Sequence, residues 1–211
     1  MLIPYIQPAY GIGLLQVSFA YLINFAGWLF ASFTNIHICS RLGTGGTLVV
    51  GAAVQSLGYA LMFWKPPFPL FIAAFFLTGM GVAYQDAQSN TFTITVKNSH
   101  RWLGILHAAY GVGTVISPLV ANTIAARTPY WHFYYLMTLC LGVINTSLLA
   151  WTFRRGLFQP NVPGAKDTAS SELKSTLSNR TVWILNTFFF LYVGAEVTAG
   201  GMCSPRLFRT L

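Results

Sequence analysis

Charged residues are scarce in this chain of 211 residues, since Asp, Glu, Lys and Arg together make up 8% of it. Acids are scarcest of all, with four Asp and Glu against twelve Lys and Arg, while 55% of the residues are hydrophobic. A soluble domain usually carries about 25% charged residues. The composition therefore excludes an ordinary water-soluble globular protein and indicates a chain whose surroundings are lipid.

Long stretches lack charge entirely, and they have the length of membrane-spanning helices. A helix needs ~20 apolar residues to cross the bilayer core. We therefore predict an all-α fold: a polytopic membrane helical bundle of about six transmembrane helices. The runs without charge are Leu14–Ile36, Leu42–Trp64, Trp102–Ala126 and Thr128–Phe153, and two more, Pro66–Val96 and Thr181–Pro205, contain a single acid each.

Cysteine is also rare, and its placement excludes several site chemistries. Cys39, Cys140 and Cys203 are far apart and have no metal-ligand spacing. The sequence contains no serine nucleophile elbow of the Gly-x-Ser-x-Gly type. We predict a protein that is not an enzyme and that uses no metal or cofactor.

The formal net charge is +8, and the distribution of the basic residues along the chain indicates a membrane topology. Nucleic-acid binding would require basic residues on one face, whereas here they are scattered, so no nucleic-acid partner is expected. Most lie in alternate links, as in Lys97–Arg101 and between residues 154 and 180. By the positive-inside rule these links are cytoplasmic and the amino terminus lies outside.

The links suggest how the chain is organised. Residues 1–13 resemble the outer end of a helix whose body is missing, followed by an outer loop. Five transmembrane helices are expected over 14–153, a polar cytoplasmic central loop over 154–180, a further helix over 181–203 and a tail over 204–211. This pattern indicates a piece of a longer protein, from either a truncated gene model or a natural short form.

Asp86 and Asn90 are the first candidates for function. They are four residues apart and share a helical face. Lys97 lies about 16 Å further along a helix at ~1.5 Å per residue, which places Asp86 well inside the membrane. An ionisable residue at that depth faces a partner helix or a watery cavity. The alternative is that Asp86 merely ends its helix near the inner interface.

Two other runs carry candidates. His107 and Tyr110 share a face of one helix, where His107 could relay protons, bind a hydroxyl-rich ligand or simply hydrogen-bond in helix packing. Glu196 shares a face with Tyr192 in the last run. A carboxyl group in such a setting can take up and release a proton as a cavity opens to either side.

These residues resemble the major facilitator superfamily, and within it the fucose permease-like proton symporters and their fungal relatives. The specific match is Gly79-x-Gly81 followed by Asp86 and Asn90-x-Phe92. In bacterial fucose permeases an acid stands four residues before an Asn-Pro-Phe. The segment Cys39–Gly43 is similar to the superfamily's inner loop between helices two and three, with Ser40 in place of the usual Asp.

The resemblance assigns roles to the candidates. Asp86 takes the place of an acid implicated in proton coupling or substrate binding, with Asn90 in the place of the asparagine. His107 and Tyr110 occupy the places of a sugar-facing Gln and Asn, and Glu196 would line the path in the seventh helix. The family implies two six-helix halves rocking around a central site. This chain would supply helices two to seven, an incomplete major facilitator fold.

The expected function is that of a membrane secondary transporter, or a fragment of one. It would move a small polar solute, possibly a sugar, by proton coupling. The alternative is a non-transporting truncated membrane protein that acts only in assembly or regulation. Its expected partners are the small-molecule solute, the proton and the lipid bilayer. The sequence is compatible with the plasma membrane and with the vacuolar membrane, and it leaves the oligomeric state open.

Overall fold

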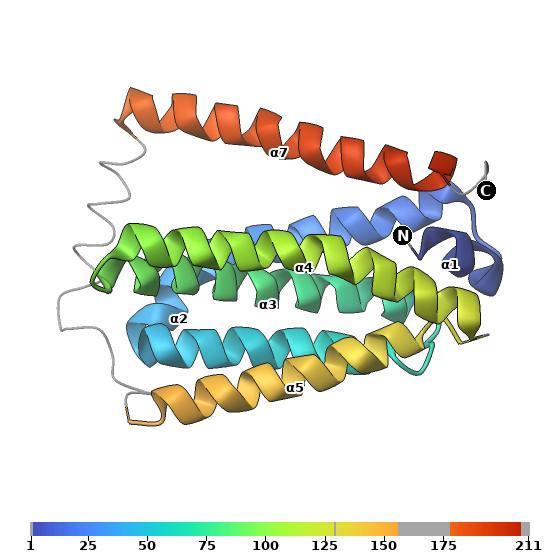
Figure 1. Cartoon of the computed structure of the whole chain (residues 1–211), viewed down its shortest axis with the longest axis horizontal. Coiled ribbons are helices and arrows are strands. Elements are labelled where there is room, and N and C mark those ends of the chain that lie inside the picture. The colour runs from blue at the N-terminus through green and yellow to red at the C-terminus, as the bar shows by residue number, and fades with distance from the viewer. Residues whose placement is uncertain (1, 129, 156–177, 208–211) are drawn as a thin grey trace. The chain divides into compact units, whose positions relative to one another are not determined.

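The computed structural model describes residues 2–128, 130–155 and 178–207, with side chains described as far as residue 195 in the last range. Every element assigned in these ranges is an α-helix, which confirms the all-α prediction (Figure 1). The helices are α1 (Ile3–Tyr10), α2 (Leu14–Met62), α3 (Phe68–Thr95), α4 (Ser99–Arg127), α5 (Phe133–Phe153) and α7 (Arg180–Leu207).

Helix α2 consists of two helices joined at a kink. Gly43 interrupts the helical geometry with φ 70° and ψ 175°, a conformation that glycine adopts because it has no Cβ. The first arm (residues 14–42) and the second arm (residues 44–62) correspond to the two uncharged runs Leu14–Ile36 and Leu42–Trp64. The chain reverses direction at the kink, so that the second arm runs in the opposite direction to the first (Figure 1).

Four helices within the described residues are long and apolar enough to cross a membrane: α2, α3, α4 and α5. With α2 counted as two arms, they account for the hydrophobic runs expected between residues 14 and 153. Helix α7 carries the last run and forms a unit of its own. Most of the predicted central loop, 154–180, and the end of the predicted tail, 204–211, lie outside the described residues.

Small residues allow α2 and α3 to pack closely. A Cβ added at Gly27 in α2 would overlap the backbone oxygen of Phe76 in α3. A Cβ added at Gly79 would overlap the backbone oxygen of Asn24, and one added at Gly81 would lie 2.5 Å from the backbone oxygen of Gly51. Helices in membranes associate through such small-residue contacts because van der Waals packing drives their association. Helix α3 therefore fits between the two arms of α2.

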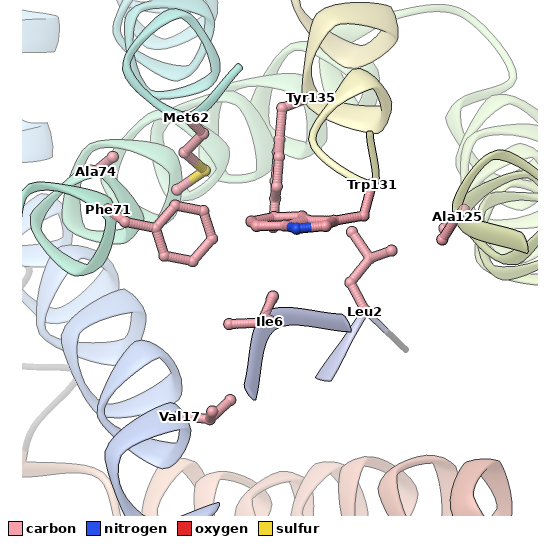
Figure 2. Close-up of a cluster of buried hydrophobic side chains, with 10 residues drawn as sticks. Leu2, Ile6, Val17, Met62, Phe71, Ala74, Ala125, Trp131 and Tyr135 are labelled. Atoms are coloured by element: carbon pink, nitrogen blue, oxygen red, sulfur yellow. The ribbon is translucent and has the colours of Figure 1, made fainter. Parts of the chain in front are cut away.

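An aromatic cluster holds one end of the bundle together (Figure 2). Phe71 of α3 is 1% exposed and lies edge-on to Trp131 and Tyr135, with ring centroids 5.8 and 5.7 Å apart. Leu2 and Ile6 of the amino-terminal segment and Met62 of α2 are buried in the same cluster. Through this cluster the short helix α1 is fixed to the ends of α2, α3 and α5.

Candidate functional site

Asp86 and Asn90 lie one turn apart in α3 and are joined by hydrogen bonds. The Asn90 side-chain amide donates to the backbone oxygen of Asp86 at 2.9 Å and to its Oδ1 at 3.2 Å. Helix α3 contains no basic residue. The Asp86 side chain is exposed on the surface of the bundle, whereas Asn90 is half-buried. The shared face predicted for these two residues is confirmed, and the Asp86 carboxylate accepts a hydrogen bond from the Asn90 amide.

Gln85, next to Asp86, lies within a chain of hydrogen bonds that crosses three helical segments. Asn145 of α5 donates from Nδ2 to Gln85 Oε1 at 2.9 Å. Gln85 Nε2 donates to Gln55 Oε1 in the second arm of α2 at 2.5 Å. Gln55 Nε2 in turn donates to the Tyr59 hydroxyl at 2.8 Å. We call Asn145, Gln85, Gln55 and Tyr59 the amide chain.

A neighbouring face of α3, which carries Tyr84 and Gln88, makes polar contacts with the first arm of α2. Gln88 is buried and donates from Nε2 to Asn35 Oδ1 at 2.9 Å. The hydroxyl groups of Tyr84 and Thr34 lie 2.5 Å apart. These neutral pairs satisfy polar groups inside an apolar bundle, where an unsatisfied group would cost several kcal/mol.

Helix α4 places its candidates at the surface. Its buried residues are Ala121 and Ala125. His107 and Tyr110 are both exposed, Tyr110 to 69%. No hydrogen bond joins either residue to Asp86 or Asn90 within the described part of the chain. The structure thus brings Asp86 and Asn90 together and leaves the α4 pair on a separate exposed face.

Glu196 belongs to α7, but its side chain falls outside the described residues. Its predicted shared face with Tyr192 and its place along a pathway therefore stay predictions. Tyr192 itself is exposed and stacks on Phe188 of the same helix, with ring centroids 6.3 Å apart.

Two ionisable groups outside the membrane-spanning helices have shifted pKa values. Burial raises the pKa of the Tyr10 hydroxyl to about 12, and this hydroxyl donates to the backbone oxygen of Pro66 at 2.7 Å. Burial and, to a smaller degree, the positive charge of Lys65 lower the pKa of His132. His132 Nδ1 is buried and has no hydrogen-bond partner among the residues that the structure describes. Both groups are therefore neutral at physiological pH.

Chemically, the described site offers one carboxylate and several neutral amides and hydroxyls. No group of three or more His, Cys, Asp or Glu that could hold a metal occurs within the described part of the chain. A carboxyl can exchange a proton, and amides can both donate to and accept from uncharged polar groups. This combination suits the binding of a neutral polar molecule beside a protonatable group.

Sequence reasoning missed Gln55, Tyr59 and Asn145, because it searched the apolar runs for charge. A usable signal was present, since Gln55 and Asn145 are amides inside runs that contain no charged residue. Amides in such runs tend to hydrogen-bond across helices. The sequence could not show that both side chains converge on Gln85.

The apolar helices and the polar contacts between them define an integral, multi-pass membrane protein. The model of the Major Facilitator Superfamily matches residues 1–202, and the chain belongs to this family.

Two known proteins show the extent of the similarity. "Bypass of stop codon protein 6" of Saccharomyces cerevisiae is 19% identical over 233 residues, covering 99% of this chain and 46% of the yeast protein. The crystal structure of a peptide transporter, POT (E310Q mutant) in complex with alafosfalin, superposes with a TM-score of 0.62 at 12% identity. It covers 98% of this chain and 44% of that transporter, and shows a shared fold. The chain thus spans about half the length of both proteins.

Proposed function

We propose that the chain is, or forms part of, a proton-coupled secondary transporter of the fucose permease-like branch, and that it moves a small polar solute of the sugar class. Membership of the Major Facilitator Superfamily supports the transporter class. The observation that carries the proposal is the setting of Asp86. Its carboxylate belongs to an apolar helix that contains no basic residue, and the Asn90 amide of the same helix donates a hydrogen bond to it.

The proposed coupling follows from the cost of charge in a membrane. When a carboxyl group is enclosed in an apolar environment, its neutral, protonated form is favoured, and it releases the proton when water returns. In this scheme Asp86 is protonated from one side of the membrane, and its neutral form permits the conformational change with the solute bound. Asn90 orients the carboxyl group through the bonds to Asp86.

The remaining candidates have proposed roles in the same cycle. His107 and Tyr110, exposed on α4, would contact the solute where the family places sugar-facing side chains. Glu196 would be a second protonatable group along the path. These roles rest on the sequence resemblance and on the positions of the residues in α4 and α7.

The test is proton uptake by liposomes that contain the purified protein and an entrapped pH-sensitive dye. Addition of a neutral hexose from a panel should acidify the interior if the protein carries solute and proton together. Asp86→Asn should abolish this acidification by removing the titrating group. Thr91→Ala is the matched control, because Thr91 is exposed in the same helix and bonds the carbonyl of Ala87 within that helix.

Two results would contradict the proposal. Acidification by Asp86→Asn as fast as by the parent protein would remove Asp86 from proton coupling. An inserted, monodisperse protein that moves neither proton nor solute for any hexose would favour the alternative, a membrane protein acting only in assembly or regulation.

A further inference from the structure

Basic side chains gather at one end of the bundle formed by α2 to α5. The kink of α2, the turn between α3 and α4, and the end of α5 all lie at this end (Figure 1). Each carries exposed basic residues: Arg41 at the kink, Lys97 and Arg101 around the turn, and Arg154 and Arg155 after α5. The acid nearest to them in α3 is Asp86, about 16 Å from Lys97 at ~1.5 Å per residue. Charges at such a distance are largely screened at physiological salt.

Phe153, the last residue of α5, holds these three parts of the chain beside one another. Its ring centroid lies 5.5 Å from that of Phe92 in α3. It also packs closely on α2, since a Cβ added at Gly45 would lie 2.7 Å from its Cδ1. Gly45 follows Arg41 by four residues, and Phe92 precedes Lys97 by five. The basic residues of α2 and of the α3–α4 turn therefore lie in the same part of the structure as the end of α5.

An exposed apolar face of α5 begins directly beside these charges. The Cζ atom of Arg154 lies over the Trp151 ring, 6.0 Å from its centroid. Trp151 is 67% exposed, and Leu148 and Ile144, three and seven residues before it on the same helical face, are 56% and 55% exposed. An apolar face of this kind on a membrane-spanning helix is solvated by lipid chains. Cations above an apolar face match the two parts of an anionic phospholipid, its headgroup and its chains.

We propose that this end of the bundle is a binding surface for an anionic phospholipid of the adjacent leaflet. Arg154 and Arg155 contact its headgroup, Arg41 and Lys97 add to the positive potential, and its chains lie along the Trp151 face of α5. The positive-inside rule assigns this end to the cytoplasm, and the cytoplasmic leaflet carries anionic lipids. A soluble acidic protein would match the charges and leave the apolar face uncovered, so the arrangement favours a lipid. The proposal is independent of transport and of the solute.

The test is thermal unfolding of the purified chain in micelles of a neutral detergent. Phosphatidylserine should raise the unfolding midpoint, because a ligand that binds the folded state stabilises it by mass action. Phosphatidylcholine has no net charge and should raise the midpoint far less. The mole fraction of phosphatidylserine that gives half of the maximal rise measures its affinity.

Variants of exposed residues locate the surface. Arg154→Gln should raise the half-maximal mole fraction about fivefold, the equivalent of about 1 kcal/mol for one cation. The double variant with Arg155→Gln should raise it about 30-fold by the same reasoning. Trp151→Ala should raise it at least about twofold through loss of the contact with Arg154. Arg127→Gln is the matched control and should leave it unchanged, because this exposed arginine lies at the far end of α4.

Several results would overturn the proposal. An equal rise with phosphatidylcholine would show that the surface does not select for negative charge. An unchanged half-maximal mole fraction in the double variant, or an equal change in Arg127→Gln, would show that this end of the bundle is not the binding surface. A rise of equal size with soluble glycerophosphoserine or polyglutamate would indicate a site for soluble anions or acidic proteins. Because no readout involves solute or proton flux, failure here leaves the proposed transport function untouched.

Discussion

The side-chain amide of Asn90 bonds both the backbone oxygen and the carboxylate Oδ1 of Asp86, at 2.9 and 3.2 Å. A single side chain thus ties the carboxyl group to its own helix, one turn away. In an apolar helix without basic residues, this amide is the described partner of the carboxylate. The proposed coupling step therefore depends on a pair of residues, and several measurable consequences arise from the pair and from the packing around it.

Asn90→Ala should slow solute-driven proton uptake by about 10- to 150-fold, because a hydrogen bond to a charged group contributes about 1.5–3 kcal/mol and the carboxyl loses its orientation. Asn90→Gln keeps an amide and should retain more activity than Asn90→Ala. The dye-loaded liposomes described above provide the rates, with Thr91→Ala as control. Unchanged proton uptake in Asn90→Ala would show that the amide has no part in the coupling step.

Gly27→Ala should destabilise the protein by about 1–3 kcal/mol, the usual cost of overpacking. The added methyl group would overlap the backbone oxygen of Phe76, which cannot rotate away as a side chain could. Gly104→Ala is the matched control, since a Cβ there meets nothing within 4 Å. It should leave stability unchanged or raise it slightly, because alanine favours helix. Thermal unfolding in detergent measures both, and an unchanged midpoint for Gly27→Ala would contradict the close packing of α2 on α3.

Phe71→Ala should cost about 3–5 kcal/mol, as expected for a buried aromatic residue replaced by alanine. Its ring contacts Trp131 and Tyr135 and is 1% exposed. Phe33→Ala changes a residue that is 72% exposed and should have little effect. The comparison again uses the unfolding midpoint in detergent, and similar midpoints for the two variants would argue against the aromatic cluster as a stabilising core.

The free energy of unfolding should fall as the pH is lowered through the pKa range of His132. The pKa of His132 is lowered in the folded chain, first by burial and then by Lys65. The unfolded chain therefore binds more protons than the folded one, so this contribution is present above about pH 6.5 and is lost as the pH falls through the lower folded value. His132→Gln should reduce the drop in unfolding midpoint between pH 7.5 and pH 5. His100→Gln, a change at an exposed histidine, should leave the drop as it is in the parent chain. Equal pH dependence in both variants would exclude His132 as its source.

How much could be predicted differs between the fold and the site. The helical class and the runs that become α3, α4 and α5 could be predicted from the sequence, because length and lack of charge are local properties. The shared face of Asp86 and Asn90 was readable for the same reason, since residues four apart in a helix are neighbours. The amide chain could not be predicted from the sequence, because Gln85 is 30 residues from Gln55 and 60 residues from Asn145 along the chain.

The sequence alone determined that this protein is an all-helical membrane protein and that the apolar run Pro66–Val96 contains one carboxyl group, Asp86, since the cost of charge in lipid acts on each segment separately. Only the tertiary structure decided which polar residues meet. The glycines at 27, 79 and 81 bring α2 and α3 close enough for side chains to bond across them. Packing also left His107 and Tyr110 exposed on α4, because which face of a helix is covered depends on its neighbours and not on its own residues.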